Sequence, residues 1–288
     1  MELVVALPAT MPAPSATKCK RMFHAKHPNA APLILAIESS CDETAAAIVD
    51  GNGTLIADVV ASQIDFHARF GGVVPEIASR KHIEAICGVC DECFDVAASA
   101  LGIERLTWRD LDSIAVTYAP GLVGALVVGV AFAKGAAWAA GKPFIGVNHL
   151  EGHLYANKIG APDFQPPAVV SLVSGGNTLL VHMKGWGDYE TLGATIDDAV
   201  GEAFDKVAKA LGLGYPGGPV ISREAAKGDP HAIPFPRAMM HSGDLRFSLS
   251  GLKNRGGHLY QQRTRRRPRA ERAEHLAPVS SKRWWTCR

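Results

Sequence analysis

Short apolar runs separated by turn residues open the patterned part of the chain. Leu33 to Glu38 and Thr44 to Val49 are two such runs, and the "GNG" after the second leads into another. Runs of this length with turn residues at their ends predict three strands. The polar, acidic "ESSCDET" joins the first two, so we expect it to form a loop.

A helical period follows. The stretch "VPEIASRKHIEAICGVCDECFDVAASALG" has apolar residues at helical spacing, Pro near its start and Gly at its end, which predicts a long helix. Next we expect a strand from Ile114 to Tyr118, the turn "APGLVG", a helix to about Ala140, and the strand "PFIGVN", which runs into a helix with two histidines. Residues 113–133 carry no charge and are long enough to span a membrane, but Pro120 and Gly121 interrupt them. A strand, a turn and a small-residue helix fit this run better.

A second patterned block begins after the Pro-rich connection "GAPDFQPP". The stretch "AVVSLVSGGNTLLVHMKG" predicts a β-hairpin, "IDDAVGEAFDKVAKALGLG" an amphipathic helix, and "YPGGPVISREAAKGDP" the start of another helix. Two consecutive units of this kind predict an α/β fold with two lobes around a cleft, which can place phosphate-binding turns on both sides of a nucleotide. We expect the first lobe at residues 31–160 and a partial second lobe at residues 161–255.

The two ends of the chain lack this patterning. Residues 1–30 predict a disordered leader, with Met22 as an alternative start. Residues 256–288 form a basic tail, in which Arg263 to Arg288 hold nine Lys or Arg and two Glu. A solvated tail, an RNA-binding arm and a shifted reading frame all fit this composition. We favour the shifted frame, because GC-rich DNA read out of frame tends to give Arg, Pro and Ala.

Composition narrows the class of protein. The chain has 288 residues, 47% hydrophobic and 20% charged, as is typical of a soluble globular protein. Residues 1–262 carry a net charge of −5, which gives no support for a nucleic-acid surface on the folded part. Six scattered cysteines argue against a secreted disulfide scaffold and favour the reducing cytoplasm. Cys87, Cys90 and Cys93 suggest either a metal cluster or one stripe of a helix; no second CxxC or nearby His completes a tetrahedral site, so we favour the stripe.

The stretch "VNHLEGHLYA" holds the first candidate site. At about 100° per residue, His149 and His153 lie about 40° apart on a helix, so both can face one metal ion. Two surface histidines fit the spacing equally well. The metalloprotease pattern H-E-x-x-H does not fit, because Glu151 lies about 200° from His149 and points away from a shared metal.

Polar turns are the second group of candidates. Glycines in "LVSGGNT" and "GYPGGP" permit positive φ and close approach of backbone N–H groups to an anion, although a hairpin turn uses glycine anyway. Asp205 either accepts hydrogen bonds from a ribose or pairs with Lys206 or Lys209. Asp197 and Asp198 are expected near a helix start.

Taken in series, these motifs resemble one family. "KGAAWAAGKPFIGVNHLEGHL" is similar to the signature of the proteins once called glycoproteases and now understood as tRNA adenosine threonylcarbamoyltransferases. "AIESSCDETAAAIVD", "GGVVPEIASRKH", "YAPGLVGAL", "LVSGGNT", "GEAFDKVAKALGLGYPGGP" and "FSLSGLK" also resemble that family, in the family's order. The resemblance covers about Leu33 to Lys253, with Asn177 where a His is usual.

The resemblance implies an actin/Hsp70/sugar-kinase-like fold of two α/β lobes. It implies transfer of a threonylcarbamoyl group from threonylcarbamoyl-adenylate to N6 of the adenosine beside the anticodon, in tRNAs that read ANN codons. The implied metal ligands are His149 and His153, for one divalent ion, iron first with zinc or magnesium as alternatives. The implied partners are tRNA, a non-catalytic paralogue and a small ATPase, in the cytoplasm, with Pro75 to Leu101 as a helical dimer surface. The implied substrate-binding residues are Leu172, Val173, Ser174, Gly175, Gly176, Asp205 and Gly218.

The resemblance also implies groups that this sequence does not contain. The family's third metal ligand is an Asp in a C-terminal "DN" motif, and an Asn from a downstream Gly-rich turn contacts the adenylate; no Asp follows Asp244 here. We therefore expect reduced activity of this chain, and aggregation of an incomplete second lobe. Two alternatives stay open: a non-catalytic nucleotide- and metal-binding protein of the same fold, and a metalloendopeptidase, the family's older assignment.

Overall fold

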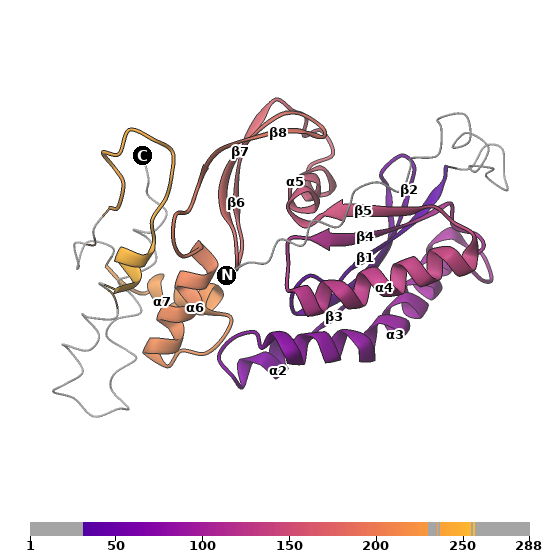
Figure 1. The fold of residues 1–288 in the computed structure, drawn as a ribbon, viewed down its shortest axis with the longest axis horizontal. Coiled ribbons are helices and arrows are strands. Elements are labelled where there is room, and N and C mark those ends of the chain that lie inside the picture. The colour runs from indigo at the N-terminus through magenta and orange to yellow at the C-terminus, as the bar shows by residue number, and fades with distance from the viewer. Residues whose placement is uncertain (1–30, 230–234, 236, 255, 257–288) are drawn as a thin grey trace.

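A computed structural model describes residues 31–229, 235, 237–254 and 256 (Figure 1). The predicted leader, and all of the predicted basic tail except residue 256, lie outside the described residues. Within them the fold is mixed α/β with two sheets, as the sequence predicted.

The first sheet has five strands in the order β3-β2-β1-β4-β5. The strands are β1 (Leu33–Glu38), β2 (Glu43–Asp50), β3 (Leu55–Ser62), β4 (Ser113–Ala119) and β5 (Phe144–Asn148). β2 pairs antiparallel with both β1 and β3, whereas β4 is parallel to β1 and to β5. Parallel neighbours need long crossovers, and these are helical here. The carboxyl ends of β1 and β5 therefore lie on the same edge of the sheet.

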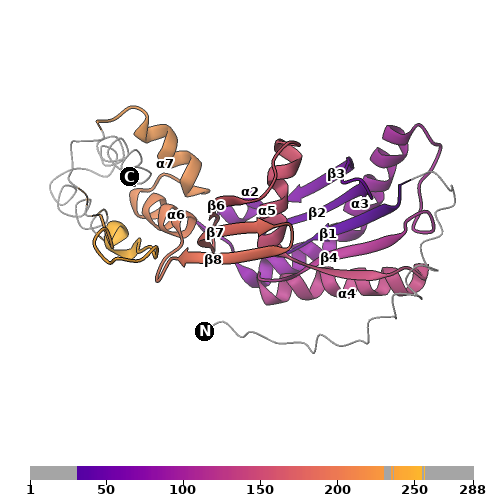
Figure 2. The same cartoon turned by 90° about the horizontal axis from the view of Figure 1, so that it is seen from above.

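Helices cover one face of this sheet (Figures 1 and 2). They are α2 (Ile64–Ala68), α3 (Pro75–Leu101) and α4 (Val123–Ala140). The predicted ends of α3 are confirmed, with Pro75 in the first turn and Gly102 in the left-handed conformation that ends the helix. Cys90 and Cys93 are buried in the core between sheet and helices, whereas Cys87 is exposed.

The uncharged run at residues 113–133 is strand β4, a turn and the first part of α4, as predicted. By length and composition alone, α4 is long and apolar enough to cross a membrane. Its inner face, including Ala133 and Ala137, packs in the same core as β1 and β4. A core helix of a soluble protein passes the same test, so this helix is weak evidence for a membrane span.

The second sheet has three antiparallel strands in the order β6-β7-β8. They are β6 (Ala168–Val173), β7 (Thr178–Gly185) and β8 (Asp188–Ala194). The hairpin was predicted; β8 was not, because "DYETLGA" has little apolar alternation. α5 (His149–Gly160) follows β5 directly and packs on this sheet, since Leu154 shares one buried cluster with Leu172, Val181 and Met183.

Two further helices complete the described part of the chain. α6 (Val200–Leu211) and α7 (Gly217–Ala225) share a small core that includes Phe204, Val207 and Ile221. Residues 237–254 follow these helices. Phe247 forms a parallel bridge with Thr195, which precedes α6, and a helical turn starts at Ser250. The resemblance predicts an actin/Hsp70/sugar-kinase-like fold of two α/β lobes, and the described residues form two sheets, with α3 and α4 packed on the first and α5 on the second.

Candidate metal and nucleotide site

The two histidines stand at the start of α5, directly after the carboxyl end of β5. The Asn148 side chain caps this helix by accepting a hydrogen bond from the Leu150 N–H at 2.9 Å. His149 and His153 lie one turn apart, and their Nε2 atoms are 3.1 Å from each other. The predicted convergence of the two imidazoles is therefore what the structure has.

This geometry fits a metal ion. Two nitrogen ligands at 2.0–2.1 Å from one ion, at angles between octahedral and tetrahedral, stand about 2.8–3.4 Å apart. The 3.1 Å between Nε2 of His149 and Nε2 of His153 lies in that interval. Burial lowers the pKa of His153, and the neighbouring His149 lowers it further. The neutral imidazole that a metal requires is thus the favoured form of His153 at neutral pH.

The other ring nitrogen of His149 faces a carboxylate that sequence reasoning missed. Nδ1 of His149 lies 3.3 Å from Oε2 of Glu38 and 3.2 Å from Oγ of Ser40. Glu38 ends β1, so the parallel arrangement of β1, β4 and β5 brings it to the same edge as His149. Burial alone would raise the pKa of Glu38, but hydrogen bonds with His149, Ser40 and Thr117 outweigh it and hold the pKa at about 2. The carboxylate is ionised at neutral pH.

Among the described residues, no third metal ligand accompanies the two imidazoles. Across residues 31–229 and the short described stretches after them, no group of three or more His, Cys, Asp or Glu could hold a metal ion. The thiol of Cys41, the residue after Ser40, is also a poor ligand, because desolvation of the sulfur, followed by the charge of Asp42, raises its pKa to about 12. The described residues supply a two-histidine half-site that fits a divalent ion.

Glu151 stands apart from this half-site. Glu151 lies two residues after His149 on α5, about 200° around the helix, so its side chain points away from the point that the two imidazoles face. The carboxylate beside the imidazoles is Glu38, on the Nδ1 side, so neither is placed as the general base of the H-E-x-x-H arrangement.

The glycine turn "SGGN" joins β6 to β7. Ser174 N–H donates to the Asn177 carbonyl at 2.9 Å, and Asn177 N–H donates to Ser174 Oγ at 3.1 Å. Neither Gly175 nor Gly176 uses the positive φ that glycine permits. Their contribution is openness: a Cβ added at either position would meet no atom within 4 Å. A ligand can approach this turn closely.

The first residues of helix α6 are hydrogen-bonded to that turn and to Thr178 after it. The N–H groups of Gly201 and Glu202 donate to the carbonyls of Ser174 and Gly175 at 3.2 and 3.1 Å, and Val200 N–H donates to Oγ1 of Thr178 at 2.9 Å. These bonds satisfy three of the donors that a helix start leaves without partners. They also fix the turn in place relative to α6.

Asp205 does not form the lysine pair that was one of its two predicted roles, and the ribose contact stays a prediction. Asp205 Oδ1 accepts from the Gly217 N–H at 2.7 Å, so it anchors the "GYPGGP" turn to α6 and does not pair with Lys206 or Lys209. Burial raises its pKa, and the charge of Asp42 adds to the shift while the Gly217 N–H opposes it. Gly218, the next residue, is open: a Cβ there would meet nothing within 4 Å.

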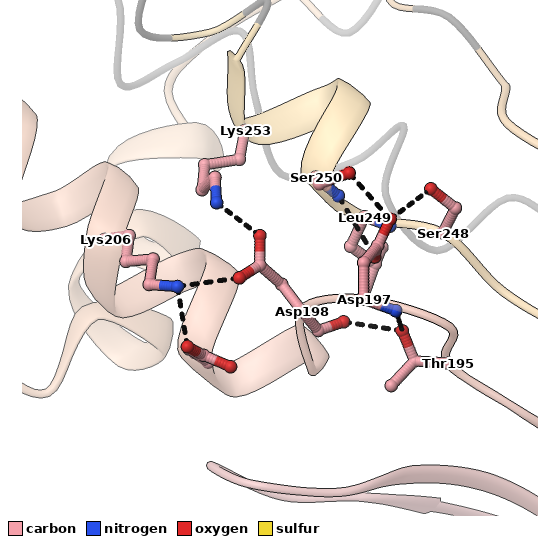
Figure 3. A network of polar contacts seen from close by, with 9 residues as sticks. Thr195, Asp197, Asp198, Lys206, Ser248, Leu249, Ser250 and Lys253 are labelled. Atoms are coloured by element: carbon pink, nitrogen blue, oxygen red, sulfur yellow. Dashed lines mark hydrogen bonds and ion pairs between the residues drawn. The ribbon is translucent and has the colours of Figure 1, made fainter. Parts of the chain in front are cut away.

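Asp197 and Asp198 hold the segment that follows residue 244 (Figure 3). Asp197 accepts from the hydroxyls of Ser248 and Ser250 at 2.5 and 2.6 Å, and from the Leu249 N–H at 2.8 Å. Asp198 pairs with Lys206 of α6 at 2.7 Å and with Lys253 at 2.5 Å. Both were expected near a helix start, and they precede α6, but their side chains form a tie between distant segments.

The loop between β1 and β2 connects the two groups of candidates. Ser40 contacts His149, and two residues later Asp42 accepts a hydrogen bond from the Tyr215 hydroxyl at 3.4 Å. Tyr215 belongs to the turn that Asp205 anchors. A continuous chain of contacts therefore runs from the imidazoles through the loop and α6 to the glycine turn at Ser174.

Comparison with known proteins places the chain in a family. The profile of the family described as TsaD, tRNA N6-adenosine threonylcarbamoyltransferase, matches residues 54–276. The chain belongs to this family. The threonylcarbamoyltransferases of Clostridium perfringens (strain SM101) and Clostridium botulinum (strain Hall) are each 56% identical to it, over 222 and 221 residues. Both alignments cover 77% of this chain and 63% of the relative, so the chain spans less than two thirds of the length of these relatives.

Solved structures with a similar course of the chain are more distant. YeaZ from Pseudomonas aeruginosa has 13% identity and a TM-score of 0.36 over 56% of this chain and 66% of its own. Component A of (R)-2-hydroxyglutaryl-CoA dehydratase from Acidaminococcus fermentans has 13% identity and a TM-score of 0.44, over 85% of this chain and 78% of its own.

Proposed function

We propose that this chain carries the metal and adenylate side of a threonylcarbamoyl-transfer site that acts on tRNA. The observation that carries the proposal is the convergence of His149 and His153, 3.1 Å apart at Nε2, beside a loop that contacts the turn anchored by Asp205. Family membership supports the same reading, although the chain spans 63% of the relatives' length.

The reaction would be an acyl transfer. The N6 amine of adenosine attacks the carbamoyl carbon of threonylcarbamoyl-adenylate, a C–N bond forms, the C–O bond to the adenylate phosphate breaks, and AMP leaves as the amine loses a proton. Holding amine and acyl group together supplies much of the rate enhancement in such a step. No activated protein nucleophile is needed, and the high pKa of Cys41 is consistent with that.

The residues of the chain would act on the adenylate from two sides. The open turn at Ser174–Gly176, with Leu172 and Val173 before it, and Gly218 would receive the adenylate through close backbone approach. Asp205 would fix the turn at Gly217 through Oδ1 and accept a hydrogen bond from the ribose through Oδ2.

His149 and His153 would hold one divalent ion, iron first and zinc or magnesium as alternatives. Such an ion, when bound, polarises a carbamoyl or phosphate oxygen as a Lewis acid. The imidazoles would hold the ion beside the β1–β2 loop, in which Ser40 contacts His149 and Asp42 accepts from Tyr215.

The proposed partners are tRNA, which is the acceptor, and two proteins, a non-catalytic paralogue and a small ATPase. Helix α3 is the proposed contact helix, and the proposed location is the cytoplasm. The lobe boundary is proposed near residue 160, between α5 and β6.

The deciding experiment is adenylate-dependent modification of tRNA. Purified full chain is mixed with threonylcarbamoyl-adenylate, an unmodified tRNA that reads an ANN codon and the two partner proteins, and modified adenosine is measured by mass spectrometry. We expect modification that His149→Ala or His153→Ala lowers on the order of 100-fold, because each removes a metal ligand. Adenylate binding without modification would instead support a non-catalytic protein of this fold. Chelator-sensitive cleavage of a protein substrate would support the metalloendopeptidase.

A further inference from the structure

Glu38 has the geometry of a group that acts on a histidine and not on a metal. Its Oε1 accepts from the Ser40 backbone N–H, and its Oε2 faces Nδ1 of His149 at 3.3 Å. The Glu38 side chain is one third exposed, and that of His149 less. The carboxylate thus bridges two partners, one on the β1–β2 loop and one on α5.

We propose that Glu38 is a positioning residue that fixes the tautomer of His149. An ionised carboxylate has acceptors only, so a neutral imidazole facing it must carry its proton on Nδ1. Ser40 Oγ, 3.2 Å from the same nitrogen, can accept as well. The Nε2 of His149, which faces His153, is then unprotonated and has its lone pair available. Pairing of this kind also holds the ring orientation and raises the basicity of the liganding nitrogen.

The inference rests on the proposed function only for its metal. The tautomer of His149 is a property of the chain without tRNA, adenylate or ion, so it can be tested even if the transfer reaction fails. If the Glu38 variants keep both transfer activity and the wild-type tautomer of His149, the inference about Glu38 is wrong and the proposed function stands.

Two substitutions separate positioning from simple space filling. Glu38→Ala removes the acceptor. Glu38→Gln keeps the size but not the chemistry: the Ser40 N–H holds the carbonyl oxygen, so the amide NH2 is left facing Nδ1. A donor there favours the tautomer with its proton on Nε2, the nitrogen meant for the metal. Glu38→Gln is therefore expected to lower Zn²⁺ affinity at least as much as Glu38→Ala does. A merely structural role for Glu38 predicts the reverse order, because Gln keeps the size of Glu.

Glu151→Gln is the matched control, because Glu151 is on the same helix as His149 but lies about 200° around it. Thermal unfolding of each full-length variant checks that it is folded.

The experiment has two readouts on the full chain. Two-bond ¹H–¹⁵N spectra report the His149 tautomer, assigned with His149→Gln, and titration with Zn²⁺ reports metal affinity. We expect the Nδ1–H tautomer in the wild type and in Glu151→Gln, the Nε2–H tautomer in Glu38→Gln, and a mixture in Glu38→Ala. Zn²⁺ affinity should fall about 10- to 100-fold in both Glu38 variants. A folded Glu38→Gln protein with the wild-type tautomer and wild-type Zn²⁺ affinity would overturn the proposal.

Discussion

Different forces hold the two sides of the site. The imidazole side consists of His149, His153 and Glu38, and the glycine side consists of the "SGGN" and "GYPGGP" turns on α6. On the imidazole side, one ionised carboxylate on a central strand orients His149 across the sheet edge. On the glycine side, neutral hydrogen bonds and close backbone contact fix two turns on α6. A single charge can set which nitrogen binds a metal, whereas a turn that receives an adenylate needs its backbone held and its surface left empty. Substitutions on the glycine side can separate these two requirements.

Gly217 offers the strongest way to break the glycine side. A Cβ at Gly217 would lie 2.5 Å from the Phe204 carbonyl oxygen and 2.7 Å from Asp205 Cα. Because both are backbone atoms of α6, Gly217→Ala must shift α7 away and weaken the bond to Asp205. We expect a loss of about 1–3 kcal/mol in the free energy of unfolding, measured by urea denaturation.

Gly218 is the neighbouring control for that substitution. Gly218→Ala meets nothing within 4 Å and lies in the first turn of α7, so its unfolding free energy should stay within about 0.5 kcal/mol of the wild type. Equal losses at both positions would mean that close approach to α6 is not what glycine provides here.

Asp197 tests how the later segment is attached to the glycine side. Asp197→Ala removes acceptors for Ser248, Leu249 and Ser250 (Figure 3), and we expect a loss of about 1 kcal/mol in unfolding free energy, reduced by solvent exposure. Asp163→Asn, an exposed aspartate before β6, serves as the control. If the two variants unfold alike, the tie contributes nothing to stability.

The same tie predicts a dependence on acid. Partial burial opposes ionisation of Asp197, but the hydrogen bonds from Ser248, Ser250 and Leu249 hold its pKa well below the usual range. A pKa lowered on folding stabilises the protein above the unfolded value of about 3.9 and stops doing so as pH falls below it. Stability of the wild type should therefore drop more steeply below about pH 4 than that of Asp197→Ala.

Periodicity predicted most of the elements, because it reports which face of a segment is buried. The ends of α3 followed from Pro75 and Gly102, and the facing of His149 and His153 followed from four-residue spacing. Pairings between distant segments leave no such trace. Glu38 lies 111 positions from His149, and only the parallel order of the sheet brings them together.

The lysine pair considered for Asp205 and the missed contact of Gly201 have a similar cause. Asp205 has two lysines close by in sequence, yet it bonds to the Gly217 N–H, because "GYPGGP" folds back onto α6. The closest approach at the "SGGN" turn is made by Gly201, whose Cβ would lie 2.6 Å from the Ser174 carbonyl oxygen. A glycine in the first turn of a helix reads as a weak helix former, so the sequence did not indicate that contact.

The substitutions with the smallest expected effect on stability test most directly whether the "SGGN" turn binds the adenylate. Gly175 and Gly176 have neither positive φ nor an atom within 4 Å of an added Cβ, so Gly175→Ala and Gly176→Ala should change the unfolding free energy by less than about 0.5 kcal/mol. If the turn receives an adenylate by close backbone approach, the same methyl groups occupy the ligand's space. Affinity for a non-hydrolysable threonylcarbamoyl-adenylate analogue, measured by calorimetry, should then fall about tenfold or more, a cost of about 1.4 kcal/mol. Unchanged affinity in both variants would place the adenylate elsewhere and leave the open turn without a role in binding.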